Sequence, residues 1–238
     1  VSHFYDKPEL EAAGWRPRAH WAGVPLRPVL TLREAATPEQ VAEKAAEGGK
    51  EMANAFAFIN GSNFSFSRER LRATIENIVQ SSGIGAVYAD AALASFVVEG
   101  AILGKAKPKD HQFERAPLDC LGGGQTDLFA TLRDALMLST RDDCCKRVAG
   151  TLFEPWARDY NGKSLRWDQA DFRQHAYAAK EPSKDHKRQE WGANLLAVIG
   201  ASVVFGVASG RAGDIQFLSL GSRIGPAGAT EFAWPIWR

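Results

Sequence analysis

The sequence predicts an α+β fold that is predominantly helical and ends in a small antiparallel sheet. Apolar residues recur at helical spacing through much of the chain after residue 36, and three short β-like segments separated by glycine-containing turns follow them. Because 45% of the 238 residues are hydrophobic, the chain can bury a core. We expect residues 1–36 to form an extended arm and residues 37–238 to form the helical domain with its β segment, with a sub-boundary near residues 105–125.

The N-terminal arm is predicted to be basic and aromatic. It contains four prolines, which fix φ and remove backbone donors, and it has no acidic residue between Trp15 and Arg33. Arg16 and Arg18 are candidates for phosphate contacts, and the indole rings of Trp15 and Trp21 are suited to stacking on unpaired bases. The same residues would also suit an arm held on its own domain by its tryptophans, or a contact with a protein partner.

The first helix is predicted to begin at Thr37. This threonine suits the N-cap, Pro38 suits the first helical position, and Gln40 completes a capping box. We expect Gly48-Gly49 to kink the helix. Its predicted apolar stripe consists of Val41, Ala45, Met52, Phe56 and Ile59.

A second helix is predicted over residues 68–79, with Ser67 as its N-cap and Ser82-Gly83 as its stop signal. Residues 86–103 are interpreted as a third helix because they are rich in alanine and leucine, although Phe96-Val97-Val98 also suits a strand. The apolar face of the second helix is expected to hold Leu71, Ile75, Ile78 and Val79.

A loop is predicted from Lys105 to Pro117, because Pro108 and Pro117 interrupt regular structure. Lys105, Lys107 and Lys109 alternate within it, which suits contacts along a phosphate backbone. A run of charges like this one is also typical of a solvated surface without a ligand.

Gly122, Gly123 and Gly124 form the glycine cluster of greatest chemical interest. Without side chains they permit a close backbone approach, and Thr126 or Asp127 then caps a helix whose N–H groups face an anion. Such a loop suits a duplex groove or a nucleic-acid backbone, and it equally suits a flexible turn. No lysine follows the glycines, so the pattern of a phosphate-binding P-loop is not met.

Asp142, Asp143, Cys144 and Cys145 are adjacent and are not expected to bind a metal. Neighbouring side chains on a helix point about 100° apart, so they do not converge on one ion. We expect a helix that buries one cysteine and exposes mixed charge. The sequence contains no C-x-x-C, H-x-x-x-H, H-E-x-x-H, G-x-S-x-G or paired-carboxylate signature and no dinucleotide fingerprint, and we therefore predict no catalytic residue and no cofactor.

Three cysteines, two of them adjacent, do not suggest a disulfide framework and favour a reducing, cytoplasmic compartment. No signal peptide is predicted after Val1, because acidic residues replace the basic start and no apolar segment follows. The longest apolar run, Leu195 to Ala208, has about 14 residues, fewer than the roughly 20 that span a membrane. No membrane partner is expected.

The final quarter is predicted to contain one helix and then an antiparallel sheet. The helix is expected over residues 187–201, with Gly192 and Gly200 allowing another backbone to approach. Its buried side chains are expected to be Trp191, Leu195, Val198 and Ile199. Strands are expected over residues 202–207, 214–220 and 230–237.

Several motifs between residues 150 and 200 occur in the order and spacing of a known family. They read Phe153-Glu154-Pro155-Trp156, Ser164-Leu165-Arg166-Trp167-Asp168, Asp171-Phe172-Arg173, Pro182-Ser183 and Gly192-Ala193-Asn194-Leu195-Leu196-Ala197. With them the chain resembles large-subunit proteins of minimal type I-U (also called I-G) CRISPR interference complexes. It departs from that family after the last motif, where a glycine-rich stretch replaces a proline-containing loop, and the first 110 residues carry no resemblance.

The resemblance implies a non-catalytic subunit of a CRISPR ribonucleoprotein effector. Its partners would be guide RNA, target DNA and the other protein subunits, and it would help to read the short motif beside the target. Lys184, Lys187 and Arg188 are predicted to contact the nucleic-acid backbone, because a Pro-Ser break places them on a turn that leads into a helix. Arg166 and Asp168 are expected to brace this loop.

The net charge of +1 gives no global indication of nucleic-acid binding, so local basic patches would have to carry it. A near-neutral chain also suits a surface that mostly meets other protein subunits. Two other functions remain open from the sequence. One is a nuclease or hydrolase whose dispersed Asp, His and Cys residues converge only in the folded protein, and the other is a purely structural scaffold.

Overall fold

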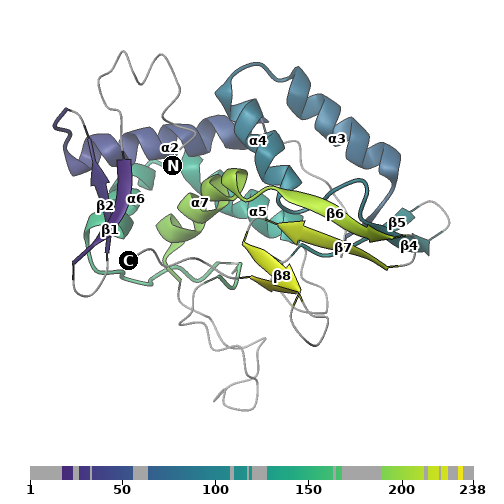
Figure 1. Ribbon diagram of the computed structural model, residues 1–238. Helices are drawn as coiled ribbons and strands as arrows, with labels where there is room; N and C mark the ends of the chain where they lie inside the picture. The colour runs from purple at the N-terminus through teal and green to yellow at the C-terminus, as the bar shows by residue number, and fades with distance from the viewer. Residues whose placement is uncertain are drawn as a thin grey trace.

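The computed structural model describes residues 18–23, 27–32, 34–55, 64–107, 110–116, 118–119, 128–162, 165–167, 189–211, 214–219, 221–224 and 230–232. Over these residues the chain forms six α-helices and nine short strands (Figure 1). All strand pairs are antiparallel, and the helices make up the larger part of the regular structure. The predicted α+β class is confirmed.

The N-terminal part of the described chain is a β-hairpin. β1 (Arg18–Ala22) and β2 (Arg27–Thr31) pair antiparallel over their whole length. Pro28 lies in β2 opposite Trp21, where its missing N–H is tolerated because both strands of a two-stranded sheet are edge strands. Strand pairing therefore holds the backbone of Arg18, one of the predicted phosphate contacts.

Helix α2 (Pro38–Ala55) begins where the sequence predicts. The N–H of Gln40 donates to Thr37 Oγ1 at 3.3 Å and the N–H of Thr37 donates to Gln40 Oε1 at 2.8 Å, so the capping box is confirmed. Where we expected a kink, α2 continues, and Gly49 serves packing instead: a Cβ there would lie 3.2 Å from carbons of Ser139 and Ile199. The buried residues of α2 are Ala42, Ala46, Gly49, Met52, Ala53 and Ala55, one position away from part of the predicted stripe.

Helices α3 (Arg68–Gln80) and α4 (Ile84–Ala94) pack side by side (Figure 1). The N–H of Arg70 donates to Ser67 Oγ at 3.1 Å, which confirms the predicted N-cap. The predicted place of Val79 on the apolar face is wrong, because this side chain is 66% exposed. Consecutive residues differ by about 100° around a helix, so residue 79 does not share a face with its buried predecessor.

The helix predicted over residues 86–103 is too long. α4 ends at Ala94, and the chain then turns so that Phe96 enters the core. The hydroxyl of Ser95 donates to the carbonyl oxygen of Ala201, far along the chain, and this contact holds the turn against the C-terminal half. Tertiary burial therefore outweighs the helix propensity of the segment.

A three-stranded antiparallel sheet follows, in the order β3-β5-β4. Its strands are β3 (Ser65–Phe66), β4 (Ile102–Lys107) and β5 (Asp110–Phe113). The loop predicted from Lys105 to Pro117 is therefore wrong over most of its length, since Lys105 and Lys107 lie in β4 and Asp110–Phe113 forms β5.

Four phenylalanine rings pack β5 against β3 and the following helix α5 (Leu128–Met137). Phe66 and Phe113 stack with centroids 4.6 Å apart, and Phe129 of the next helix meets Phe66 at 5.9 Å and Phe64 at 5.4 Å. All four side chains are buried. Each buried ring stabilises the folded state by about 1.5–3 kcal/mol relative to an exposed ring.

The remaining helices are α5 (Leu128–Met137), α6 (Cys144–Phe153) and α7 (Trp191–Gly200), with short 3₁₀ turns η2 (Leu138–Thr140) and η4 (Ala201–Val203). Helix α7 lies in the middle of the molecule and contacts α2, α4, α5 and α6 (Figure 1). The predicted helical core is confirmed. Of its members, Met52, Leu71, Leu195, Val198 and Ile199 are buried, Val41 and Ile75 are half-buried, and Phe56 lies outside the described residues.

Two separate hairpins end the described chain. They consist of β6 (Gly206–Arg211) with β7 (Asp214–Ser219), and of β8 (Ser222–Ile224) with β9 (Thr230–Phe232). The strand predicted from residue 202 is wrong at its start, because the chain is a 3₁₀ turn there and β6 begins at Gly206. A Cβ at Gly206 would lie 2.1 Å from the ring of Phe217, so the buried ring determines where the strand can begin.

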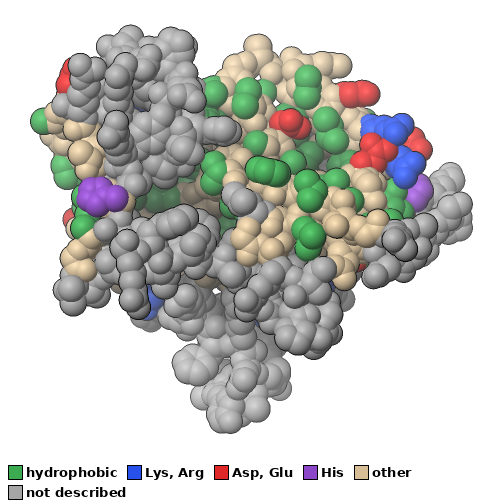
Figure 2. All heavy atoms as spheres, viewed as in Figure 1, with side chains coloured by type: hydrophobic (Ala, Val, Ile, Leu, Met, Phe, Trp, Pro, Cys, Tyr) green, Lys and Arg blue, Asp and Glu red, His purple; other side chains and the backbone are tan. Residues whose placement is uncertain are grey.

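Figure 2 shows the face that carries α4 and the β6–β7 hairpin. Hydrophobic side chains are spread over it, and basic and acidic side chains gather at one edge. Val87 and Phe205 are 59% and 56% exposed. Arg68 and Arg72 pair with Glu99 at 3.2 and 2.6 Å, and because these groups are exposed each pair adds little stability.

The two glycines of α7 provide a first test of this packing. A Cβ at Gly192 would lie 2.2 Å from Thr151 Oγ1 and 3.0 Å from the carbonyl oxygen of Arg147, so Gly192→Ala should lower the free energy of unfolding by about 1–3 kcal/mol. A Cβ at Gly200 would meet nothing within 4 Å, so Gly200→Ala should be neutral or stabilise by up to about 1 kcal/mol. Chemical denaturation measures both, and equal effects would contradict the close approach of α6 and α7.

Candidate functional site

Three segments that are far apart in the sequence meet beside the first turn of α7. Trp156 follows α6, Trp167 lies in the described residues 165–167, and Asn194 lies in α7. These three residues belong to three of the motifs on which the family resemblance rests. Together with Glu190, Ala193 and Ala197 they line a cavity of about 170 Å³, which we call the α6–α7 cavity.

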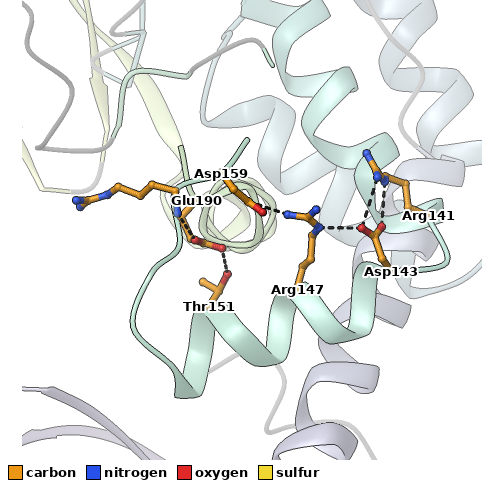
Figure 3. Close-up of polar contacts among 7 residues, drawn as sticks. Arg141, Asp143, Arg147, Thr151, Asp159 and Glu190 are labelled. Carbon is orange, nitrogen blue, oxygen red and sulfur yellow. Dashed lines mark hydrogen bonds and ion pairs between the residues drawn. The ribbon is translucent and has the colours of Figure 1, made fainter. Parts of the chain in front are cut away.

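The carboxylate of Glu190 is the chemical centre of this cavity. Thr151 Oγ1 donates to Glu190 Oε1 at 2.7 Å, and the backbone N–H of Arg158 donates to Oε2 at 3.2 Å (Figure 3). Glu190 is only 8% exposed, and both of its described donors are neutral groups. Gly192 makes the arrangement possible, because a larger residue would push α6 and Thr151 away.

Both tryptophans of the cavity are held by their indole nitrogens. Trp156 Nε1 donates to the carbonyl oxygen of Thr151 at 3.0 Å, and Trp167 Nε1 donates to the carbonyl oxygen of Leu118 at 2.8 Å. The Trp167 ring is also parallel to the ring of Phe96, with centroids 6.2 Å apart. Trp156 remains 47% exposed. These hydrogen bonds fix the orientation of both rings. Because both indole N–H groups are already hydrogen-bonded, a ligand can contact only the faces and edges of the rings.

The backbone around the cavity adopts an unusual conformation. Arg158 and Arg166 have φ values of 49° and 56°, and Phe64 is the other non-glycine residue with positive φ in the described chain. Non-glycine residues rarely take this left-handed conformation, and such positions cluster at functional sites. The predicted bracing role of Arg166 stays a prediction, and its predicted partner Asp168 lies outside the described residues.

A second set of hydrogen bonds closes the cavity on the side of Asn194. Asn194 Nδ2 donates to Gln189 Oε1 at 2.8 Å, and Gln189 Nε2 donates to the carbonyl oxygen of Gly162 at 3.1 Å. The backbones of Gln189 and Tyr160 pair in both directions, at 3.0 and 3.1 Å. The loop after α6 is therefore tied to the start of α7.

The outer face of α6 carries an ion-pair network. Arg147 Nε lies 2.8 Å from Asp143 and its Nη1 lies 2.8 Å from Asp159, while Arg141 pairs with Asp143 at 3.0 Å (Figure 3). The hydrogen bond from Arg147 lowers the pKa of Asp143 below its usual value. The Arg147 guanidinium also lies 5.5 Å from the ring centroid of Trp191, so it links the network to α7.

The predicted character of α6 is confirmed. Cys144 is buried, Cys145 is exposed, and the charges lie on the outer face. Within the described ranges, no group of three or more His, Cys, Asp or Glu side chains is placed to hold a metal ion. The carboxylate of Asp143 accepts hydrogen bonds from Arg141 and Arg147.

Among the predicted nucleic-acid contacts, the structure describes the backbones of three, which lie in two different sheets. Arg18 lies in β1, and Lys105 and Lys107 lie in β4, with only their backbones described. The other candidates, Arg16, Lys109, Gly122, Gly123, Gly124, Lys184, Lys187 and Arg188, lie outside the described residues. Their roles stay predictions. Glu190 was not among the predicted site residues, because its burial and its hydrogen bond to Thr151 arise only when α6 packs on α7.

A larger cavity of about 320 Å³ lies at the start of α4. It is lined by Glu51, Asn54, Ala55, Ser81, Ser82, Gly83, Ile84, Gly85 and Ala86. Its described lining has no aromatic ring and includes none of the motif residues. The α6–α7 cavity is therefore the stronger candidate, because aromatic walls with a few fixed polar groups are typical of ligand sites.

Comparisons with known proteins identify no relative. No protein-family model, curated protein or solved structure matches the chain. Among the described helices, none is both long enough and apolar enough to cross a bilayer.

The hydrogen bond between Thr151 and Glu190 can be tested by an isosteric change. Thr151→Val removes the hydroxyl from a buried carboxylate, so the free energy of unfolding should fall by about 1–3 kcal/mol. Thr151→Ser keeps the hydroxyl and should recover more than half of this decrease. If Thr151→Val is as stable as the unchanged protein, or if serine is no better than valine, the hydrogen bond to Glu190 does not stabilise the fold as proposed.

The adjacent cysteines should differ in reactivity. Burial raises the pKa of Cys144 to about 11, so its thiolate, the reactive form, is scarce at pH 8, while Cys145 is exposed. Iodoacetamide should label Cys145 at least about tenfold faster than Cys144 in the folded protein. Tandem mass spectrometry distinguishes the two sites, and denatured protein, in which both should react alike, is the control. Equal labelling of the folded protein would contradict the burial of Cys144.

Proposed function

We propose that this chain is a non-catalytic subunit of a CRISPR ribonucleoprotein effector, which holds guide RNA and target DNA and helps to read the short motif beside the target. One observation carries the proposal: the motif residues Trp156, Trp167 and Asn194, separate in the sequence, line one cavity. Residues that belong together functionally are expected to converge in this way. The family relation itself rests on the resemblance of residues 150–200.

In this function the protein positions nucleic acid, while base pairing supplies the long sequence specificity. With a net charge of only +1, phosphate contacts would have to come from local groups, of which Lys184, Lys187 and Arg188 are the most concentrated near the motif residues in sequence. The rest of the surface would meet other protein subunits. The exposed hydrophobic side chains on the face of α4 and β6 are compatible with such contacts (Figure 2).

The test is the triple variant Lys184→Ala, Lys187→Ala, Arg188→Ala in the assembled complex. Because these cations would neutralise phosphates, their removal should weaken binding to all sequences about equally. The salt dependence should also become shallower, by about one unit of slope for each phosphate that is no longer neutralised. Filter binding or fluorescence anisotropy over a range of salt concentrations measures both quantities.

A control with the same change of charge is available in the described chain. Lys50, Arg70 and Lys146 are exposed, and their triple replacement by alanine should leave the salt slope nearly unchanged. If both triple variants behave alike, the segment near residue 184 is only a solvated surface. Metal-dependent cleavage of labelled DNA that requires this chain would instead support the nuclease alternative.

A further inference from the structure

We infer that the α6–α7 cavity binds an organic cation, an alkylammonium or guanidinium group, between the indole rings of Trp156 and Trp167 and beside the carboxylate of Glu190. The inference rests on the geometry of the cavity and is independent of the proposed function. The cation can belong to a small molecule or to a lysine or arginine side chain of a partner, and the chemistry of recognition is the same for both.

The first argument is the carboxylate. A buried carboxylate is costly unless it is paired with a cation or bound to a metal. Glu190 is 8% exposed, yet within the described structure its donors are the Thr151 hydroxyl and the Arg158 N–H, and no ion pair reaches it. The cavity therefore has a negatively charged wall that a cationic ligand would neutralise.

The second argument is the pair of aromatic walls. A cation over the face of an indole is attracted by the ring quadrupole, with tryptophan the best of the aromatic residues and about 2 kcal/mol or more available when the site excludes water. Trp156 already attracts a cation of this kind, since the guanidinium of Arg158 lies 5.7 Å from its ring centroid. Both indole N–H groups are engaged with backbone carbonyls, so the rings offer π-surface and not donors.

The third argument concerns the volume of the cavity and the charge of the ligand that it can accept. A volume of about 170 Å³ is below the roughly 300–1,000 Å³ of sites for drug-sized ligands, so the cavity suits a single head group. Phosphates and carboxylates are disfavoured beside Glu190. The nearby cation Arg147 is committed to Asp143 and Asp159 and is not positioned to fill the cavity.

The experiment compares choline with 3,3-dimethyl-1-butanol, a neutral molecule of the same shape, by calorimetry and ligand-observed NMR on the full chain. Choline should bind at least about tenfold more tightly, a difference of about 1.4 kcal/mol. Methylguanidinium should compete with choline for the same site. Peptides with a central lysine or arginine, compared with norleucine peptides, show whether a side chain can supply the cation.

Two variants and a matched control locate the binding. Glu190→Gln should abolish the preference for choline over its neutral counterpart, and Trp156→Ala should weaken choline binding about tenfold. Glu154→Gln removes the same charge from an exposed residue outside the cavity lining and should leave the affinity unchanged. Trp156 is half exposed, so its replacement tests the site even if the Glu190 variant does not fold.

Several results would overturn the inference. They are equal binding of choline and the neutral molecule, equal effects of Glu190→Gln and Glu154→Gln, or the absence of saturable choline binding to the folded chain. Cytidine that binds more tightly than choline and competes for the same residues would show a base-stacking site instead. None of these measurements uses guide RNA or target DNA, so their failure is distinguishable from failure of the proposed function.

Discussion

Helix α7 has ten residues and is apolar on almost every side, so exposing any of its faces to water would cost free energy. It is enclosed by α2, α4, α5 and α6. Trp191 and Leu195 are completely buried in this enclosure. Packing so many helices around one short helix requires close backbone approach, which Gly49 of α2 and Gly192 of α7 provide. The positions of the surrounding helices follow from the burial of α7.

The same enclosure produces the candidate site. Because Gly192 brings α6 against α7, Thr151 reaches Glu190 and the carboxylate stays out of water. The described residues after α6 pair with Gln189 just before α7, and Trp156 and Asn194 line the same cavity. The cavity is thus a consequence of core packing at a helix terminus, and its side chains are fixed by backbone carbonyls that belong to that packing.

The charged side chains of the described structure lie in two kinds of environment, exposed ion pairs and buried carboxylates. Most of the described ion pairs lie on outer faces, as at Arg147 and Asp143, although Arg115 pairs with the buried carboxylate of Asp119. The carboxylate of Glu190 is instead buried among neutral donors. Exposed ion pairs contribute little free energy. A buried carboxylate, in contrast, is costly unless its neighbours are cations or hydrogen-bond donors. The proposed cation site lies at the cavity beside Glu190, whereas the proposed phosphate contacts lie at other residues, so the two proposals do not compete for the same side chains.

The local features of the fold could be predicted from residue spacing alone. The capping box of Thr37, the N-cap of Ser67, the stripe of α7 and the mixed-charge face of α6 depend on neighbours within one or two turns, so spacing suffices to predict them. Tertiary structure decided the rest. Buried phenylalanine rings hold β5 against β3 and α5 where a loop was predicted, and α4 ends just before the buried Phe96, because burial contributes more free energy than local propensity does. Glu190 could not be assigned from the sequence, since its burial and its hydrogen bond depend on a residue 39 positions earlier that only the packing of α6 on α7 brings within reach.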